Sequence, residues 1–357
     1  MVMPGERGAN GSSNFCPIYC IVPPHMLKEI ARRGSARQQA WAWQTLTLSE
    51  QMRGQRQALS VIAAMGTTAT GTKRRTVYDA GNGSTLPGRL VRGEGDPKSK
   101  DVGVNEAYDG AGATYDLYFK VYGRNSIDER GMRLDSTVHY GRKYDNAFWN
   151  GQQMVYGDGD GELFNRFTIA IDVIGHELTH GVTEYEAGME YHDQPGALNE
   201  SFSDVFGSLV KQYKRRQTAK GADWLIGKGL LAPGVKGKAL RSMKEPGTAY
   251  DDDVLGKDPQ PGHMKDYVKV HDDNGGVHIN SGIPNRAFYE TAIRLGGNAW
   301  TKAGEIWYVT LRDKLRPTSS FSDAARWIVA VAKDLYGAGS LEQRAVREGW
   351  AAVGIRV

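Results

Sequence analysis

The spacing of hydrophobic residues changes partway along this chain. Before residue 164, short runs rich in valine, tyrosine and threonine are separated by glycine turns, a pattern typical of β-strands. Three such runs occupy residues 76–79, 89–92 and 136–140. From residue 164 onward, hydrophobic residues recur at the spacing of amphipathic helices. The sequence therefore predicts a β-rich first lobe followed by a mostly α-helical second lobe.

Helical spacing is regular from residue 202 to residue 213 and returns later in the chain. Residues 108–122, in the first lobe, also fit a helix better than a strand. A further helical pattern runs from residue 27 to about residue 64, within an N-terminal leader. Four more helices are predicted in the second lobe, at residues 283–295, 299–315, 321–336 and 341–353.

Length and composition agree with this architecture. The chain has 357 residues, of which 40% are hydrophobic. A chain of this size can bury a large core, and its length suggests two lobes with an appended segment. Together with the two kinds of hydrophobic spacing, this indicates an α+β fold.

Charge is distributed unevenly along the chain. Residues 1–75 contain 10 Lys or Arg against 3 Glu, a net charge of +7. Subtracting these from the totals of 45 basic and 41 acidic residues leaves 35 against 38, a net charge of −3 for the remainder. The basic excess therefore belongs to the leader, and no nucleic-acid recognition motif accompanies it. We expect no nucleic-acid partner, and the glycine-rich runs at 157–161 and 275–276 lack a phosphate-loop pattern.

The strongest chemical signal is the segment His176-Glu177-Leu178-Thr179-His180. Two histidines four residues apart on a helix project from one face, where their ring nitrogens can hold one cation. Glu177 then lies beside the metal without ligating it. A catalytic zinc usually takes three protein ligands and keeps a fourth position for water. A carboxylate from another element is therefore still required.

A second segment, residues 196–204, supplies that carboxylate. Glu200 is the candidate third ligand, and Asp204 follows it by one helical turn. An outer carboxylate such as Asp204 commonly holds the far ring nitrogen of a ligating histidine, here His176, and so fixes its tautomer. Finding ligand and support together argues against an exposed helix that carries these residue types by chance.

At this point the sequence resembles the thermolysin family of zinc metalloendopeptidases, and within it the protealysin-like branch with a short prosegment. A third zinc-ligating histidine six residues after His180, as in metzincins, is excluded because Glu186 stands there. The resemblance covers most of the chain outside the leader. Its motifs are residues 146–151, 154–161, 176–180, 196–204, 241–243 and 273–278.

The resemblance implies one zinc ion per chain, ligated by His176, His180 and Glu200, with Glu177 as the general base. Such a site hydrolyses peptide bonds with a metal-activated water, which makes the chain a candidate neutral endopeptidase. Four further catalytic assignments follow from the family: Tyr191 and His278 stabilise the oxyanion, Asp273 orients His278, and Asp204 orients His176.

Substrate contacts are implied in the same way. Asn146 and the backbone of Ala147 match positions that pair with an extended peptide, and Arg241 matches a side chain that holds a substrate carbonyl. The pocket for the residue after the cleaved bond is apolar throughout, so we expect cleavage before large hydrophobic residues. Its six positions are Phe164, Phe167, Val173, Ile226, Leu230 and Leu240.

The leader resembles the prosegment of protealysin-like precursors, which blocks the cleft until it is removed. We therefore expect a zymogen with a prosegment at residues 1–65, its boundary lying between 58 and 76. A β-rich lobe that includes the zinc-binding helix would follow at 66–190, and an α-helical lobe at 191–357. Lys73-Arg74-Arg75 is either a processing site or a solvated basic turn.

No apolar run typical of a signal peptide or a transmembrane span is visible. We therefore expect no membrane partner, and either a cytoplasmic location or export by a non-classical route. Both cysteines, Cys16 and Cys20, fall in the leader. Either of them, or His25, could cap the zinc in the precursor, although simple steric blocking is the more economical reading.

The sequence departs from thermolysin at the positions that bind calcium there. The acidic cluster that binds two calcium ions there corresponds here to Asp172, Lys211, Asp223, Leu225 and Lys228. Three of these five positions lack a carboxylate, as does Lys238 at another calcium position. Calcium requires several oxygen ligands, so calcium binding is possible but most of its ligands are missing. We expect the two lysines of the cluster to replace the ions electrostatically.

Two other functions stay open at this stage. A zinc-binding protein without turnover would be expected to lack Glu177, Tyr191 or His278, and all three are present. A zinc exopeptidase would need a feature that captures a chain terminus, whereas the segment at 146–147 favours internal cleavage. The expected partners are peptide and protein substrates and the chain's own prosegment as an intramolecular inhibitor, and we expect a monomer.

Overall fold

The computed structural model describes residues 19–59 and 71–357, and its first lobe is built on a six-stranded sheet. The β-rich first lobe predicted from the sequence is confirmed. Residues 136–140 were predicted as a strand, and the observed strand lies two residues earlier. The strands are β1 (Tyr19–Cys20), β2 (Arg75–Asp79), β3 (Arg89–Arg92), β4 (Leu134–Val138), β5 (Ala147–Trp149) and β6 (Gln153–Tyr156).

The strand order in this sheet is β1-β5-β6-β4-β2-β3. β4 runs parallel to its neighbours β2 and β6, whereas the other pairs are antiparallel. β1 comes from the leader and forms one edge of the sheet, next to β5. The leader therefore extends the sheet of the first lobe by one strand.

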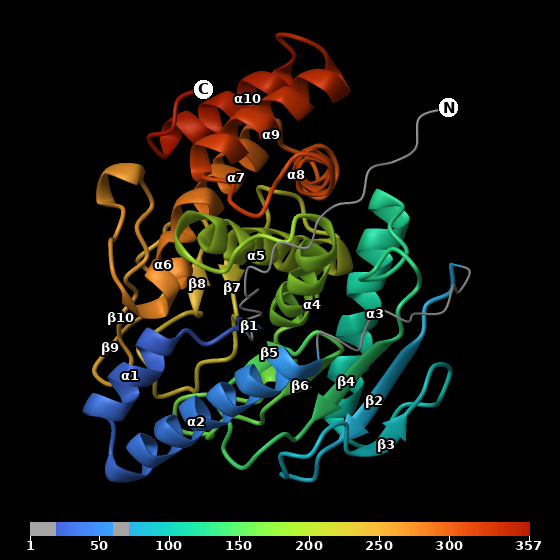
Figure 1. Cartoon of the computed structure of the whole chain (residues 1–357), viewed down its shortest axis with the longest axis vertical. Helices are drawn as coiled ribbons and strands as arrows, with labels where there is room; N and C mark the ends of the chain where they lie inside the picture. The colour runs from blue at the N-terminus through green and yellow to red at the C-terminus, as the bar shows by residue number, and fades with distance from the viewer. Residues whose placement is uncertain (1–18, 60–70) are drawn as a thin grey trace.

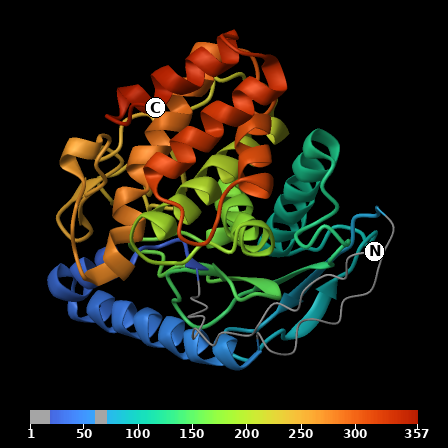
Figure 2. The same cartoon turned by 45° about the horizontal axis from the view of Figure 1, so that its top comes forward.

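Helices cover both faces of the sheet (Figures 1 and 2). On one face lie α3 (Val102–Tyr122) and α4 (Ile171–Glu186), the helix that carries the HExxH segment. On the other face, α2 (Ala36–Leu59) crosses below the sheet and buries Met52 against Tyr144 and Phe148. The leader thus contributes to the packing of the first lobe as well as to its sheet.

The helical pattern expected from residue 27 to about 64 is two helices in the described part of the leader. α1 (Pro24–Arg33) ends at Gly34, and α2 begins directly after Ser35. Ser35 and Gln38 exchange backbone and side-chain hydrogen bonds, which caps the new helix (2.9 and 3.3 Å). Hydrophobic spacing alone did not reveal this local break. The end of the expected helix, beyond residue 59, lies outside the described residues.

The second lobe is mostly α-helical, as predicted (Figure 1). Its helices are α5 (Asp193–Arg215), α6 (Asp272–Asn280), α7 (Gly282–Leu295), α8 (Lys302–Asp313), α9 (Phe321–Tyr336) and α10 (Leu341–Ala352). Short elements complete the fold: β7 (Leu225–Ile226), β8 (Arg241–Ser242), β9 (Asp251–Asp252), β10 (Gly256–Lys257), η1 (Phe167–Ile169) and η2 (Met264–Asp266). Within the described residues, no helix is both long and apolar enough to cross a membrane.

Glycines allow α4 and α5 to cross closely at the centre of the molecule. A Cβ at Gly207 would lie 2.3 Å from the carbonyl oxygen of Asp172, and one at Gly175 would lie 3.0 Å from the Gly207 Cα. Real side chains do not tolerate such contacts. The backbones of α5 and α4 are therefore in direct contact beside His176. The polar faces of the two helices consequently lie against each other.

A partly buried histidine joins β4 to the start of α3. His139 Nε2 lies 2.8 Å from Asp101, which caps α3 through Gly103 N (2.7 Å). His139 Nδ1 lies 2.9 Å from Asp158. The hydrogen bond to Asp158 is the largest contribution that raises the pKa of His139 to about 9, and burial opposes it.

This cluster predicts a stability that depends on pH. An ordinary histidine titrates near pH 6.5, so the protonated His139 contributes its full stabilisation below about pH 6.5 and loses it as the pH rises through about 9. In the variant His139→Asn, we expect the free energy of unfolding to fall less over this interval. Asn is chosen because residue 139 has a φ of 56°, which Asn tolerates. Denaturant unfolding at several pH values measures the difference, and parallel curves would contradict the assignment.

Candidate metal centre

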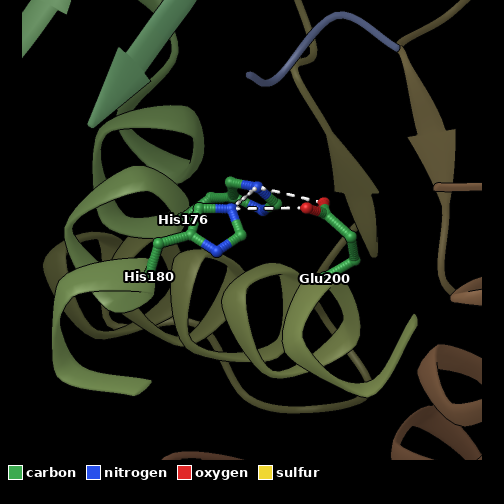
Figure 3. A group of neighbouring side chains, drawn as sticks. All are labelled: His176, His180 and Glu200. Atoms are coloured by element: carbon green, nitrogen blue, oxygen red, sulfur yellow. Dashed lines mark hydrogen bonds and ion pairs between the residues drawn. The ribbon is translucent and has the colours of Figure 1, made fainter. Parts of the chain in front are cut away.

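Three buried side chains converge where α4 meets α5 (Figure 3). His176 and His180 project from one face of α4, and their Nε2 atoms lie 3.0 Å apart. Glu200, from α5, points at both rings, with a carboxylate oxygen 3.5 Å from each Nε2. These residues are the single group among the described residues whose ligand atoms could hold one metal ion.

The hydrogen bonds around the two rings define which nitrogens are free. His176 Nδ1 lies 2.8 Å from Asp204 Oδ1, and His180 Nδ1 lies 2.8 Å from Asn199 Oδ1. Both partners accept, so each Nδ1 carries the proton and each Nε2 presents a lone pair. Burial lowers the pKa of His180, which keeps this ring neutral.

Two lone pairs at 3.0 Å, beside a carboxylate, repel one another unless a cation lies between them. Glu200 Oε2 is also buried without a hydrogen-bond partner in the described part of the chain. Two neutral imidazoles and one carboxylate are a ligand set that suits zinc. The residues present therefore fit a bound zinc ion.

Asp204 is itself fixed from three sides. Besides His176, it accepts two hydrogen bonds from Arg241 (2.8 Å each) and one from Asn285 (2.8 Å). Burial would raise the pKa of Asp204, but Arg241 and His176 hold it below its usual range. Asp204 thus stays ionised and accepts a hydrogen bond from His176 Nδ1.

Three supporting residues were not identified from the sequence. Asn199 and Ser203 both contact His180 Nδ1 (2.8 and 3.0 Å), and their four-residue spacing on α5 could have placed them on one face. Asn285 reaches Asp204 from α7. Its position carries no sequence signal, because the contact joins segments 81 residues apart.

Glu177 is fully buried between the metal ligands and the sheet. One carboxylate oxygen accepts from the Trp149 backbone N–H (3.1 Å), and the nearby backbone amide of Ile21 in the leader also lowers the pKa of Glu177. Oε1 is buried with no other partner among the described residues. Burial raises the pKa of Glu177 well above its usual range, and the Glu200 carboxylate raises it further.

On the other side of Glu200 lie Tyr191 and His278. The Tyr191 hydroxyl donates to Glu200 and lies 3.2 Å from His278 Nε2. Asp273 holds His278 through its ring Nδ1 (2.5 Å) and its backbone N–H (3.0 Å). Burial alone would lower the pKa of His278, but Asp273 and Glu200 raise it to about 9.

The residues predicted to bind an extended peptide contact the leader. Ile21 N donates to the Ala147 carbonyl (3.2 Å), and Val22 N donates to Asn146 Oδ1 (3.0 Å). Arg241 Nη1 donates to the Ile21 carbonyl (3.1 Å). Backbone groups of the leader thus contact all three of these residues.

The six apolar residues predicted as a pocket are buried in the large core cluster, which also contains Ile21. The Phe164 and Phe167 rings lie 5.9 Å apart, and Leu240 N donates to the Ile226 carbonyl (2.9 Å). Leu230 packs near Leu240 across Gly227. Val173 lies on α4 and is also fully buried.

Of the groups considered as zinc caps, His25 and Cys20 lie outside the three-residue metal cluster. His25 Nε2 lies 3.5 Å from the Tyr250 hydroxyl, and burial lowers the pKa of His25 to about 4. Cys20 is buried in β1, and its carbonyl oxygen lies 3.2 Å from His278 Nε2. Cys16 is outside the described residues, as is much of the expected processing region.

The positions that correspond to calcium ligands form a charge cluster around Lys211. Its ammonium group contacts Asp172 and Asp223 (2.8 Å each) and the Leu225 carbonyl (2.5 Å). Lys228 lies 3.5 Å from Asp223, with a more exposed side chain. Lys211 therefore contacts Asp172, whereas Lys228 contacts Asp223.

Models of one protein family match most of this chain. The model described as "Thermolysin metallopeptidase, catalytic domain" matches residues 48–184. The model described as "Thermolysin metallopeptidase, alpha-helical domain" matches residues 187–355.

Individual proteins match over nearly the whole length. An "Extracellular metalloprotease" of Pectobacterium carotovorum subsp. carotovorum is 52% identical, covering 96% of this chain and 97% of that protein. "Protease PrtS" of Photorhabdus sp. (strain Az29) is 49% identical, covering 94% and 92%. The solved structure "Precursor of Protealysin, Metalloproteinase from Serratia proteamaculans" is 54% identical, with a TM-score of 0.87, covering 94% of this chain and 99% of that one.

These matches correct the expected location. The sequence led us to expect a cytoplasmic protein or export by a non-classical route, and this was wrong. The Pectobacterium relative is named as extracellular, which points to secretion. The expectation was based on the absence of an apolar N-terminal run. This feature reports on one targeting signal and not on the final location of a protein.

The contacts of Asp204 predict its effect on the metal. Asp204→Asn should weaken zinc binding by about 10- to 100-fold, because the amide no longer holds His176 as a charged acceptor. Competition with a chromophoric chelator measures the affinity. The matched control is Asp109→Asn, at an exposed position on α3. Equal zinc affinities for the two variants would contradict the role of Asp204.

Proposed function

Because this chain belongs to the thermolysin family of zinc metallopeptidases, we propose that the centre between α4 and α5 hydrolyses internal peptide bonds. The chain is a metalloendopeptidase precursor whose leader acts as an intramolecular inhibitor. The observation that carries the proposal is the buried convergence of His176, His180 and Glu200. When bound there, zinc lowers the pKa of a water ligand and polarises the substrate carbonyl.

The protein's own residues are proposed to transfer the proton and to orient the metal ligands. Glu177, beside the ligands, accepts the proton of the attacking water and delivers it to the leaving nitrogen. Its Oε1 atom, which is buried without a hydrogen-bond partner among the described residues, supports this role. Asp204 keeps His176 in the tautomer that leaves Nε2 free, and Asn199 does the same for His180.

Negative charge on the substrate oxygen needs donors that are already in place. Tyr191 and His278 are proposed for this task, since both are buried beside Glu200 and Asp273 orients the His278 ring. Against the effect of burial, Asp273 raises the pKa of His278 and so favours the protonated ring, which donates more strongly to a developing oxyanion.

Substrates are proposed to add a strand to the edge of the sheet, where the leader now lies. Asn146, the Ala147 carbonyl and Arg241 would bind the substrate backbone, as they bind Ile21 and Val22. The apolar pocket is proposed for the residue after the cleaved bond, which favours large hydrophobic side chains there. Its members are Phe164, Phe167, Val173, Ile226, Leu230 and Leu240.

The domain division is proposed as a prosegment at 1–65, a β-rich lobe at 66–190 and an α-helical lobe at 191–357. We further propose a monomer without nucleic-acid or membrane partners. The alternatives are less well supported, because Glu177, Tyr191 and His278 surround the metal ligands and an extended backbone fits along β5. A zinc protein without turnover needs none of these groups.

The decisive test compares wild type with Glu177→Gln. We expect the variant to retain one zinc ion but to lose about two to four powers of ten in turnover, because the amide cannot accept the water proton. Both proteins are assayed on a peptide blocked at both ends with leucine after the central bond, and zinc is measured by elemental analysis. Full activity of the variant, or of wild type after zinc removal, would contradict the proposed function.

We also propose that Lys211 replaces calcium. Its ammonium group is almost fully buried and bridges Asp172 and Asp223, so the acids need no metal ion. Stability is therefore proposed to be independent of calcium.

The lysine cluster offers a matched pair of variants. Lys211→Met should lower the free energy of unfolding by about 3–5 kcal/mol, because Asp172 is left buried without its partner. Lys228→Met should cost less than about 1 kcal/mol, since its side chain is 57% exposed. Denaturant unfolding with and without calcium measures both. A strong stabilisation of wild type by micromolar calcium would reject the replacement.

A further inference from the structure

The leader crosses the proposed catalytic site as an extended strand in a fixed register. β1 runs antiparallel to β5, with Cys20 opposite Phe148. The pairing continues past β1, since Ile21 N donates to the Ala147 carbonyl (3.2 Å). One leader peptide bond, between Cys20 and Ile21, is thereby held beside the metal ligands.

Two of the proposed catalytic side chains lie at opposite ends of this peptide bond, one at its carbonyl oxygen and one at its nitrogen. His278 Nε2 lies 3.2 Å from the Cys20 carbonyl oxygen. The Glu177 carboxylate lies near the Ile21 backbone amide, which lowers the pKa of this carboxylate. Hydrolysis requires a donor at the carbonyl oxygen and a proton carrier beside the leaving nitrogen. The Cys20–Ile21 bond has both.

Contacts on either side keep the bond in place. The Tyr19 ring stacks on the His180 ring, with centroids 4.2 Å apart and planes 11° apart. Ile21 is fully buried, and Arg241 holds its carbonyl oxygen (3.1 Å). A segment that blocked the cleft only by its bulk would need neither the antiparallel direction relative to β5 nor the register that places Cys20 opposite Phe148.

We propose that the Cys20–Ile21 peptide bond is an internal substrate, which the chain hydrolyses in its own site. This inference rests on the proposed peptidase function. Water adds its oxygen to the Cys20 carbonyl carbon, and the bond to the Ile21 nitrogen breaks. Glu177 transfers the water proton to that nitrogen, so the products are a carboxylate on Cys20 and an amine on Ile21. Water is the single co-reactant.

This cut differs from removal of the whole leader. α1 and α2 follow Ile21, so they stay covalently attached after the cut. Met26, Leu27 and Ile30 of α1 remain buried in the core. The new amine of Ile21 would also remain beside the Glu177 carboxylate, and the opposite charges would attract. Exposure of the cleft would then still require the cut proposed between residues 58 and 76.

The test follows the full-length chain after purification with a chelator and addition of zinc. We expect mass spectrometry and N-terminal sequencing to detect fragment 1–20 and a chain, or a released leader, that begins at Ile21. The rate should not depend on protein concentration. Glu177→Gln should remain intact at this bond, and Ile21→Asp should lose this product because it places a charge in an apolar site. The matched control Arg32→Gln, exposed on α1, should be cut as wild type is.

A second readout does not depend on turnover. In the uncut Glu177→Gln chain, the amides of Ile21 and Val22 should be protected from hydrogen exchange, because they donate to Ala147 and Asn146. Exchange as fast as in an unstructured peptide would overturn the register and with it the inference.

The outcomes separate this inference from the proposed function. If wild type cleaves the added peptide but no product ever begins at Ile21, the internal substrate is rejected and the peptidase stands. A cleavage rate that rises in proportion to protein concentration rejects hydrolysis within one molecule. If zinc-loaded wild type cleaves neither the added peptide nor itself, both ideas fail.

Discussion

The structure depends on two imidazole lone pairs that face each other at 3.0 Å in the buried interior. Asp204 and Asn199 bind the opposite ring nitrogens, so neither ring can turn to relieve the repulsion. Only a cation between the rings makes this arrangement favourable. Arg241 in turn balances the charge of Asp204, which links the metal centre to the wall of the substrate cleft.

The proposed inhibition by the leader and its proposed hydrolysis rest on the same geometry. Asn146, Ala147 and Arg241 bind backbone groups, which every peptide has, so the leader binds through contacts that a substrate would also make. The proposed inhibition would then come from the covalent attachment of the leader and the burial of α1 and α2, and not from a special blocking group. The leader competes as a tethered peptide with a high effective concentration.

Much of the catalytic centre could be predicted from the sequence, because helical spacing brings residues four apart to one face. His176 with His180, and Glu200 with Asp204, follow this rule. The break at Gly34 and the position of Asn285 could not be predicted in this way. A helix break depends on local capping, and Asn285 reaches Asp204 only because α7 packs beside α5. The strand at Cys20 is likewise defined by its partner β5, which lies more than a hundred residues away.

The metal centre and Lys211 both connect α4 to α5. The contacts of Lys211 need no metal ion, whereas the chemistry of the metal centre does. Lys211 of α5 reaches Asp172 in the first turn of α4, and Gly207 lets the helix backbones touch nearby. These contacts are covalently part of the chain and persist without any ion. His176 and His180 lie further along α4 and, together with Glu200 of α5, would hold an exchangeable cation. Packing of the helices is therefore secured by the lysine and the glycine contact, and the exchangeable ion is left to serve the chemistry.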